Sequence, residues 1–103
     1  MARTIYIWVD DVRPAPEGYI WCKSVNQAKQ VIRGEELAGT HIALLDVDHD
    51  AGDFAFDGGD YIQLLNWLEE TERDYPIHIH SMNPVGVQNM RNIIQHNDWE
   101  EVR

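Results

Sequence analysis

The 103-residue sequence predicts an α/β sandwich with a mostly parallel sheet of four or five strands in the order 2-1-3-4. Short apolar runs alternate with segments of helical periodicity, which is the pattern of parallel strands joined by crossover helices. Hydrophobic residues make up 44% of the chain, which is enough for a packed core and excludes wholesale disorder. A second domain would be too small to bury its own core, so residues 1–103 are expected to form one domain.

The strands are expected where β-branched and aromatic residues cluster. Residues 4–9 are continuously apolar and predict a strand buried on both faces. Residues 13–18 hold two prolines and a glycine and predict a loop, so the next strand, at residues 19–22, follows without an intervening helix. We favour parallel pairing of these two strands, with antiparallel pairing as the alternative. Further strands are expected at residues 41–47 and 76–81, with a short edge strand at 99–102.

Three helices are expected between and after these strands. A capping box at Ser24 and Gln27 starts a helix that extends to about residue 36. Residues 61–72 have apolar side chains at helical spacing, and Asn83, followed by proline, suits the N-cap of the last helix. The stripes predicted to face the core are Val25, Ala28, Val31 and Ile32, then Tyr61, Leu64, Leu65 and Leu68, then Val87, Met90 and Ile94.

The composition excludes several classes of protein. Eighteen acidic residues oppose eight Lys and Arg, and a formal net charge of −10 repels a long nucleic acid, although acidity also serves solubility. Cys22 is the single cysteine, which excludes an internal disulfide and is expected to be inert core. No apolar run approaches the roughly 20 residues of a membrane span, and no signal-peptide pattern opens the chain. We therefore expect no membrane partner and a cytoplasmic location, while the oligomeric state stays open.

Acidic side chains gather where the first and third strands end. In an open parallel sheet, ligands bind outside the carboxyl ends of the strands, and the order 2-1-3-4 makes these two strands neighbours. Like charges in one site raise a pKa or recruit a cation, and carboxylate oxygens suit Mg²⁺. We therefore predict a divalent-metal site for Mg²⁺ or Mn²⁺, with ordinary turn formation as the alternative. The candidate ligands are Asp10, Asp11, Asp46 and Asp48, and the sequence does not choose between the last two.

Groups that suit a phosphate lie at the same predicted edge of the sheet. The helix start at Asn83 offers free backbone amides, and Gly86 would let a ligand approach the backbone closely. Ser81 can donate a hydrogen bond to a phosphoryl oxygen. Arg13 can clamp a phosphate with two hydrogen bonds, although a salt bridge to a neighbouring carboxylate is equally consistent with the sequence.

Two histidines are candidates for proton transfer. His80 lies at the end of the fourth strand, nearest the predicted site, and its ordinary pKa lies close to neutrality. His49, between Asp48 and the loop that follows, is the second candidate. Either could instead be a hydrogen-bonded structural histidine. For His78, which shares a strand face with His80, that structural role is the one we expect.

Four motifs carry a resemblance to a known family. They are WVDDVRPAP at residues 8–16, DHDAGD at 48–53, GDY at 59–61, and HIHSMNPVGVQNM at 78–90. Together they resemble the receiver fold of response regulators, and more closely the cyclic-phosphate-processing receiver-like family. The resemblance implies a truncated receiver, or flavodoxin-like, fold that binds or hydrolyses cyclic phosphates in settings associated with RNA repair. The helix between the first two strands is missing and no lysine follows Lys29, which disfavours phosphotransfer signalling.

Two functions follow as expectations. The first is a metal-assisted phosphoesterase acting on a cyclic phosphate, in a small nucleotide or at an RNA end with a 2′,3′-cyclic phosphate. In it a cation on Asp10, Asp11 and Asp48 polarises the phosphoryl oxygens, which Arg13, Ser81 and Asn83 hold. His80, His49 and Asp48 are the candidate catalytic residues. The alternative is a non-catalytic module that binds a phosphate ligand or a partner protein.

Overall fold

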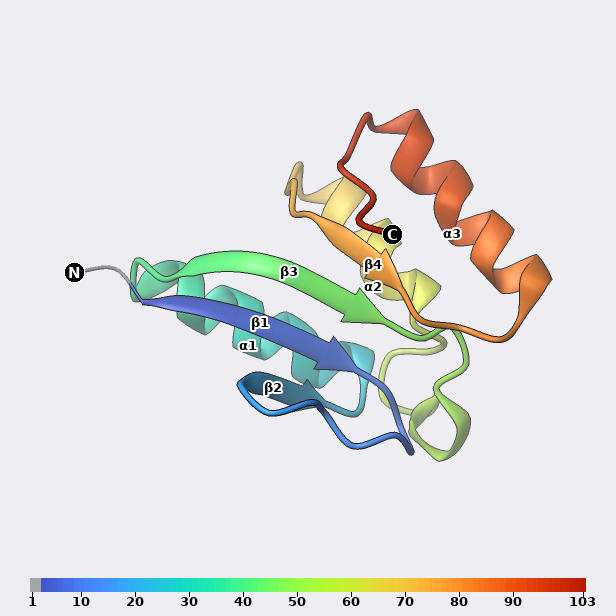
Figure 1. Cartoon of the computed structure of the whole chain (residues 1–103), viewed down its shortest axis with the longest axis horizontal. Helices are drawn as coiled ribbons and strands as arrows, with labels where there is room; N and C mark the ends of the chain where they lie inside the picture. The colour runs from blue at the N-terminus through green and yellow to red at the C-terminus, as the bar shows by residue number, and fades with distance from the viewer. Residues whose placement is uncertain (1–2) are drawn as a thin grey trace.

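The computed structural model describes residues 3–103, which form a parallel four-stranded sheet in the order β2-β1-β3-β4 with helices packed against it (Figure 1). The predicted fold class and strand order are therefore confirmed. No helix in this described range is long and apolar enough to cross a bilayer. In chain order the elements are β1 (Thr4–Val9), β2 (Tyr19–Cys22), α1 (Val25–Leu37), β3 (His41–Val47), the 3₁₀ helix η1 (Gly52–Phe54), α2 (Ile62–Glu70), β4 (Ile77–Ile79) and α3 (Pro84–His96).

Neighbouring strands of the sheet are all parallel, including β1 and β2. The favoured pairing of the first two strands is thus the observed one, and the Pro-rich loop between them makes the crossover. The expected edge strand at residues 99–102 is wrong. Within residues 3–103, Glu101 forms only an isolated bridge to Ile77 beyond the four strands.

Two boundaries differ from the expected ones. The helix expected over residues 61–72 runs only from Ile62 to Glu70, because Glu72 adopts a φ of 55°, which no right-handed helix accommodates. The strand expected over residues 76–81 is limited to Ile77–Ile79. Its flanking backbone still bonds to β3, since Leu45 N donates to Pro76 O over 2.9 Å. The segment carrying the predicted site residues therefore leaves the sheet before Ser81.

The helices cover one face of the sheet. Figure 1 shows α1 and α2 behind the strands and α3 beside α2. Ile5, Ile7 and Val9 of β1 are buried, whereas Tyr6 between them is 42% exposed. The expectation that β1 is buried on both faces is therefore wrong. The reason is that an extended loop, at residues 10–18, stands where a crossover helix would cover the second face.

The predicted stripes and caps position the helices. Most stripe residues are buried in one core, and Val31 and Val87 lie at its margin. Ser24 caps α1 by accepting from Gln27 N, while the Gln27 side chain accepts from Lys23 N, one residue before the usual partner in a capping box. Cys22 is fully buried, and this burial raises the pKa of its thiol to about 12, as expected of an inert core cysteine.

Candidate functional site

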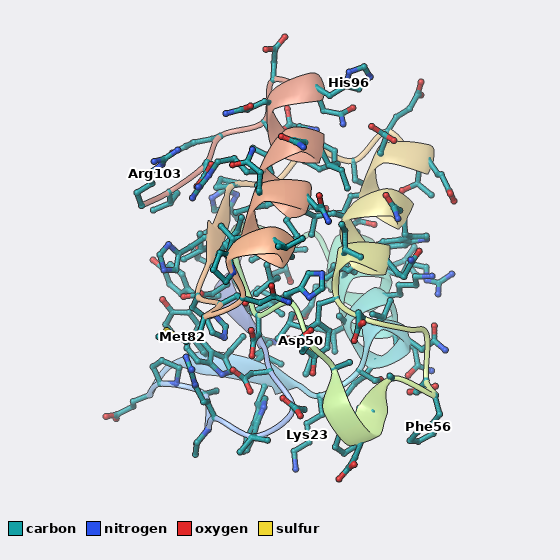
Figure 2. All side chains as sticks on the ribbon, turned by 90° about the vertical axis from the view of Figure 1, so that its right-hand side faces the viewer. Lys23, Asp50, Phe56, Met82, His96 and Arg103 are labelled. Carbon is teal, nitrogen blue, oxygen red and sulfur yellow. The ribbon has the colours of Figure 1, made fainter. Side chains whose placement is uncertain are left out.

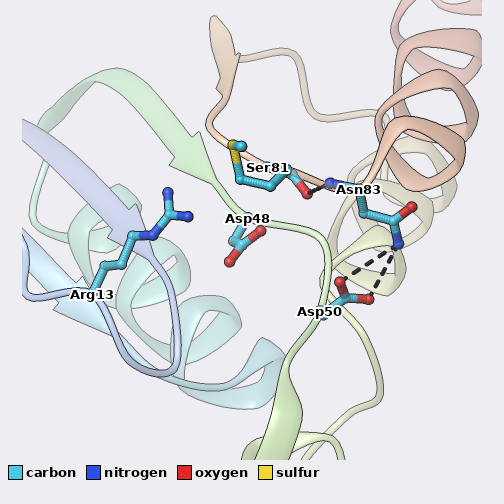
Figure 3. Close-up of a pocket in the computed structure, with 6 residues that line it drawn as sticks. Arg13, Asp48, Asp50, Ser81 and Asn83 are labelled. Atoms are coloured by element: carbon cyan, nitrogen blue, oxygen red, sulfur yellow. Dashed lines mark hydrogen bonds between the residues drawn. The ribbon is translucent and has the colours of Figure 1, made fainter.

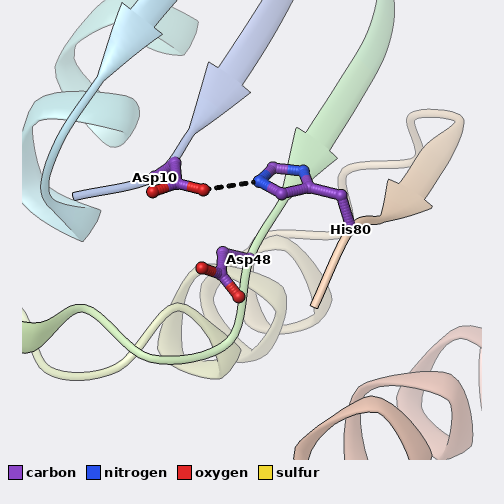
Figure 4. Close-up of side chains that lie close together, drawn as sticks. All are labelled: Asp10, Asp48 and His80. Atoms are coloured by element: carbon purple, nitrogen blue, oxygen red, sulfur yellow. Dashed lines mark hydrogen bonds and ion pairs between the residues drawn. The ribbon is translucent and has the colours of Figure 1, made fainter. Parts of the chain in front are cut away.

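Three strands deliver side chains to one point at the carboxyl edge of the sheet. Asp10 follows β1, Asp48 follows β3 and His80 follows β4. One ligand atom from each lies within 4.8 Å of the other two (Figure 4). Backbone hydrogen bonds fix this convergence, since Asp48 N donates to Val9 O and His80 N donates to Val47 O, each over 2.9 Å. The acids of two distant segments therefore do meet at a single site.

The imidazole of His80 lies between two carboxylates. Its Nε2 is 2.9 Å from Asp10 Oδ2 and its Nδ1 is 2.6 Å from Asp46 Oδ1. The ring also stacks on Trp8, with centroids 3.8 Å apart and planes 5° from parallel. Burial favours the neutral ring, but the hydrogen bonds to Asp46 and Asp10 outweigh it and raise the pKa of His80. A protonated ring donates to both carboxylates at once.

Asp10 is an anion held by its own turn. Its side chain is almost completely buried, which opposes ionisation. Oδ1 accepts from Val12 N and Arg13 N, each over 2.9 Å, and Oδ2 faces His80. These hydrogen bonds more than compensate for burial and lower the pKa of Asp10. The Asp-Asp pair after β1 therefore forms a turn and supplies a site carboxylate, so the two interpretations of this motif are compatible.

The other three predicted acids differ in their surroundings. Asp48 belongs to the three-ligand cluster and is partly exposed. Asp46, only 6% exposed, lies outside that cluster and bonds to His80. Asp11 packs against Gly52, where a Cβ would collide with its carboxylate. Burial and the charges of Asp10 and Asp48 raise the pKa of Asp11, because each of them disfavours its anion.

A pocket of about 340 Å³ opens beside Asp48 (Figure 3). Nη1 of Arg13 donates to His80 O over 3.3 Å, which holds the guanidinium beside the segment that follows β4. Arg13 forms no ion pair within the described residues, so the salt bridge considered from the sequence is absent there. The lining residues are Arg13, Asp48, Asp50, Ser81, Met82 and Asn83. All three predicted phosphate-binding residues therefore share one pocket with Asp48.

The start of α3 is less open than the sequence suggests. Asn83 is its N-cap and accepts from Gly86 N over 3.1 Å. The ring of His49 packs directly on Gly86, where a Cβ would overlap it. The expectation that Gly86 admits a ligand to the backbone is therefore wrong, because this histidine occupies the space. Nδ1 of His49 lies 2.9 Å from Asp50 Oδ1, outside the cluster of Asp10, Asp48 and His80.

Trp8 and Met82 also contact the candidate site, and neither was predicted from the sequence. Trp8 stacks on His80 and donates from Nε1 to Arg13 O over 2.9 Å. The alternation of β1 places Trp8 on the same face as Asp10, which is the signal that could have found it. Met82 is 83% exposed at the pocket, and Figure 2 shows it with Asp50 near the start of α3.

His78 has the structural surroundings that we expect from the sequence. Its Nδ1 lies 2.7 Å from Val102 O, and the residue is partly buried.

Comparison with known proteins agrees with this architecture. A family model described as the cyclic-phosphate processing receiver domain matches residues 5–96, from β1 to the end of α3. No curated protein and no solved structure gives a significant match. The matched range contains every residue of the cluster and of the pocket.

Proposed function

Because the chain belongs to the family of cyclic-phosphate processing receiver domains, we propose that it is a metal-assisted phosphoesterase that opens a cyclic phosphate. The ester would belong to a small nucleotide or to an RNA end with a 2′,3′-cyclic phosphate. The observation that carries the proposal is the convergence of Asp10, Asp48 and His80 beside a pocket that contains Arg13. This arrangement combines anionic ligands, a proton donor and a phosphate-binding cation.

A divalent ion fits the donor set of the cluster. The carboxylates of Asp10 and Asp48 are oxygen ligands of the kind that Mg²⁺ and Mn²⁺ prefer. The raised pKa of Asp11 supports the fit, since burial and two like charges disfavour its anion and a cation would relieve the repulsion. When bound, the ion would polarise the phosphoryl oxygens and stabilise their charge.

The protein residues account for binding and proton transfer. Arg13, Ser81 and Asn83 hold the phosphoryl oxygens in the pocket. A water oxygen bonds to phosphorus while the water gives a proton to Asp48 or His49. The bond from phosphorus to one ribose oxygen breaks, and the imidazolium of His80 protonates that oxygen from Nε2, which must first release Asp10 Oδ2. The product is a phosphomonoester, and Asp46 keeps the His80 ring in position throughout.

The test is hydrolysis of a 2′,3′-cyclic nucleotide with Mg²⁺ or Mn²⁺, followed by separation of the substrate from its phosphomonoester. Asp48→Ala and His80→Ala should each lower kcat by about 10²-fold or more. Asp74→Ala and His96→Ala are matched controls, since both side chains are exposed and lie outside the cluster and the pocket. Absence of turnover, or turnover unchanged in Asp48→Ala and His80→Ala, would refute the proposal.

A second candidate is a receiver-like module that binds a phosphate ligand or a partner protein without cleaving anything. It is favoured by the engagement of both ring nitrogens of His80 with carboxylates, which leaves neither nitrogen free. Calorimetry with Mg²⁺ and nucleotides separates the two, because binding without hydrolysis supports the module. Labelling of Asp46 by acetyl phosphate would instead indicate phosphotransfer signalling.

A further inference from the structure

Positive charge is concentrated in the groove between α1 and α2. Three of the eight Lys and Arg residues lie over the indole ring of Trp67, on α2. Lys29 Nζ lies 5.7 Å from the ring centroid, Arg33 Cζ 5.6 Å and Arg73 Cζ 4.3 Å. Cations at these distances are attracted by the ring quadrupole. A chain of net charge −10 therefore keeps a basic surface on its helical side.

Two of these three cations have no anionic partner within the part of the chain that the structure describes. Arg73 is neutralised by Glu36, whose Oε1 lies 2.9 Å from Arg73 Nη2. Lys29 and Arg33 form no ion pair with any residue in the range 3–103. They are one turn apart on α1, so both side chains lie on the same face of that helix. Stacking on Trp67 restricts both side chains in advance, which lowers the entropy cost of binding an anion.

A pocket of about 350 Å³ lies next to these two cations and is lined in part by Arg33. Its lining residues are Arg33, Glu36, Leu37 and Arg73. Leu37 stands one turn after Arg33 on α1 and is 91% exposed. The surface therefore presents two free cations, then a pocket, then an apolar side chain. A ligand with carboxylates near an apolar residue is its chemical complement.

We infer that the groove formed by Lys29, Arg33, Leu37 and Trp67 docks an acidic segment of a partner protein. A nucleic acid fits less well, because three cations already lie over the Trp67 ring, on which a base would have to stack. A second copy also fits less well, since two whole chains of net charge −10 repel over their full surfaces, whereas a short acidic segment meets only the local cations of the groove. The second half of α1 lies at the opposite end of the strands from the phosphate pocket, so docking leaves that pocket accessible.

The test is a titration of the ¹⁵N-labelled full chain with a capped peptide of glutamates and leucines, at near-physiological salt. The amides expected to shift are those of the second half of α1 and those around Trp67 and Arg73. The double variant Lys29→Glu/Arg33→Glu should weaken binding by about tenfold or more, whereas the single charge reversal Arg103→Glu, away from the groove, should leave it unchanged. Arg103 is 68% exposed on its side chain and lies outside the groove.

Several outcomes would overturn the inference. They are absence of binding, shifts that map outside the groove, and equal weakening by the double variant and by Arg103→Glu. An oligouridylate that shifts the same amides at lower concentration than the peptide would assign the groove to RNA instead. Concentration-dependent self-association that the double variant abolishes would assign it to a second copy. Retained dispersion of the amide spectrum shows that each variant is folded.

Discussion

Nδ1 of His80 and Oδ1 of Asp46 lie 2.6 Å apart, which is the separation of a strong, charge-assisted hydrogen bond. The two residues stand side by side because Asp46 of β3 pairs with the strand that ends just before His80. Carboxylates that hold a histidine in this way fix its ring orientation. We therefore expect Asp46 to act through His80, whereas Asp48 lines the pocket.

Replacement of Asp46 by asparagine should lower the pKa of His80. Burial of the ring already favours its neutral form, and the variant removes one of the two carboxylates that overcome this effect. NMR titration of the His80 ring in EDTA measures the pKa, and hydrolysis of a cyclic nucleotide should slow by about 10–100-fold. Asp74→Asn is the control, because Asp74 is exposed and lies outside both the cluster and the pocket. An unchanged His80 pKa in Asp46→Asn would contradict this role.

Binding of a divalent metal ion should raise the free energy of unfolding, and removal of the ion should lower it again. If the native state alone binds Mn²⁺ or Mg²⁺ at Asp10 and Asp48, a concentration of 100 times Kd should add about 2.7 kcal/mol to the free energy of unfolding. EDTA should reverse the gain. Asp48→Asn should abolish it, while Asp74→Asn, on an exposed acid outside the cluster, should keep it. Thermal unfolding monitored by circular dichroism is the measurement, and an equal gain in Asp48→Asn would remove Asp48 from the site.

The sheet and the identity of the segments at the site followed from local patterns. The alternation of apolar runs and helical segments predicts a parallel sheet, whereas the order 2-1-3-4 was the condition on which the convergence of the acids depended, and the structure confirms that order. The choice between Asp46 and Asp48 could not be made, since both lie on one face of an extended chain and only tertiary contact with His80 separates them. The exposed face of β1 was missed because an apolar run is equally typical of a strand covered on one side.

The close contact between Gly86 and His49 predicts a specific cost of adding one methyl group. A Cβ at Gly86 would overlap the His49 ring, so Gly86→Ala should displace that ring and lower the free energy of unfolding by about 1–3 kcal/mol. Gly34→Ala is the matched control, because Gly34 is helical and exposed with no atom in the way, and it should raise stability by about 1 kcal/mol. Urea unfolding measures both, and a neutral or stabilising Gly86→Ala would mean that His49 moves away freely.

The contacts of the Glu36 carboxylate with Arg73 and Tyr75 should stabilise the fold at neutral pH and stop doing so in acid. Hydrogen bonds from Arg73, aided by Tyr75, lower the pKa of the Glu36 carboxyl below its ordinary value of 4.5, against the effect of burial. The ionised form therefore stabilises the folded state above the unfolded pKa, and this contribution disappears as the pH falls through the lowered, folded pKa. Glu36→Gln should cost about 1 kcal/mol at pH 7, and the difference from the natural chain should vanish in acid. Urea unfolding across this pH range tests the trend, with exposed Glu100→Gln as the control. A Glu36→Gln cost that persists at low pH would show that the loss comes from packing rather than from charge.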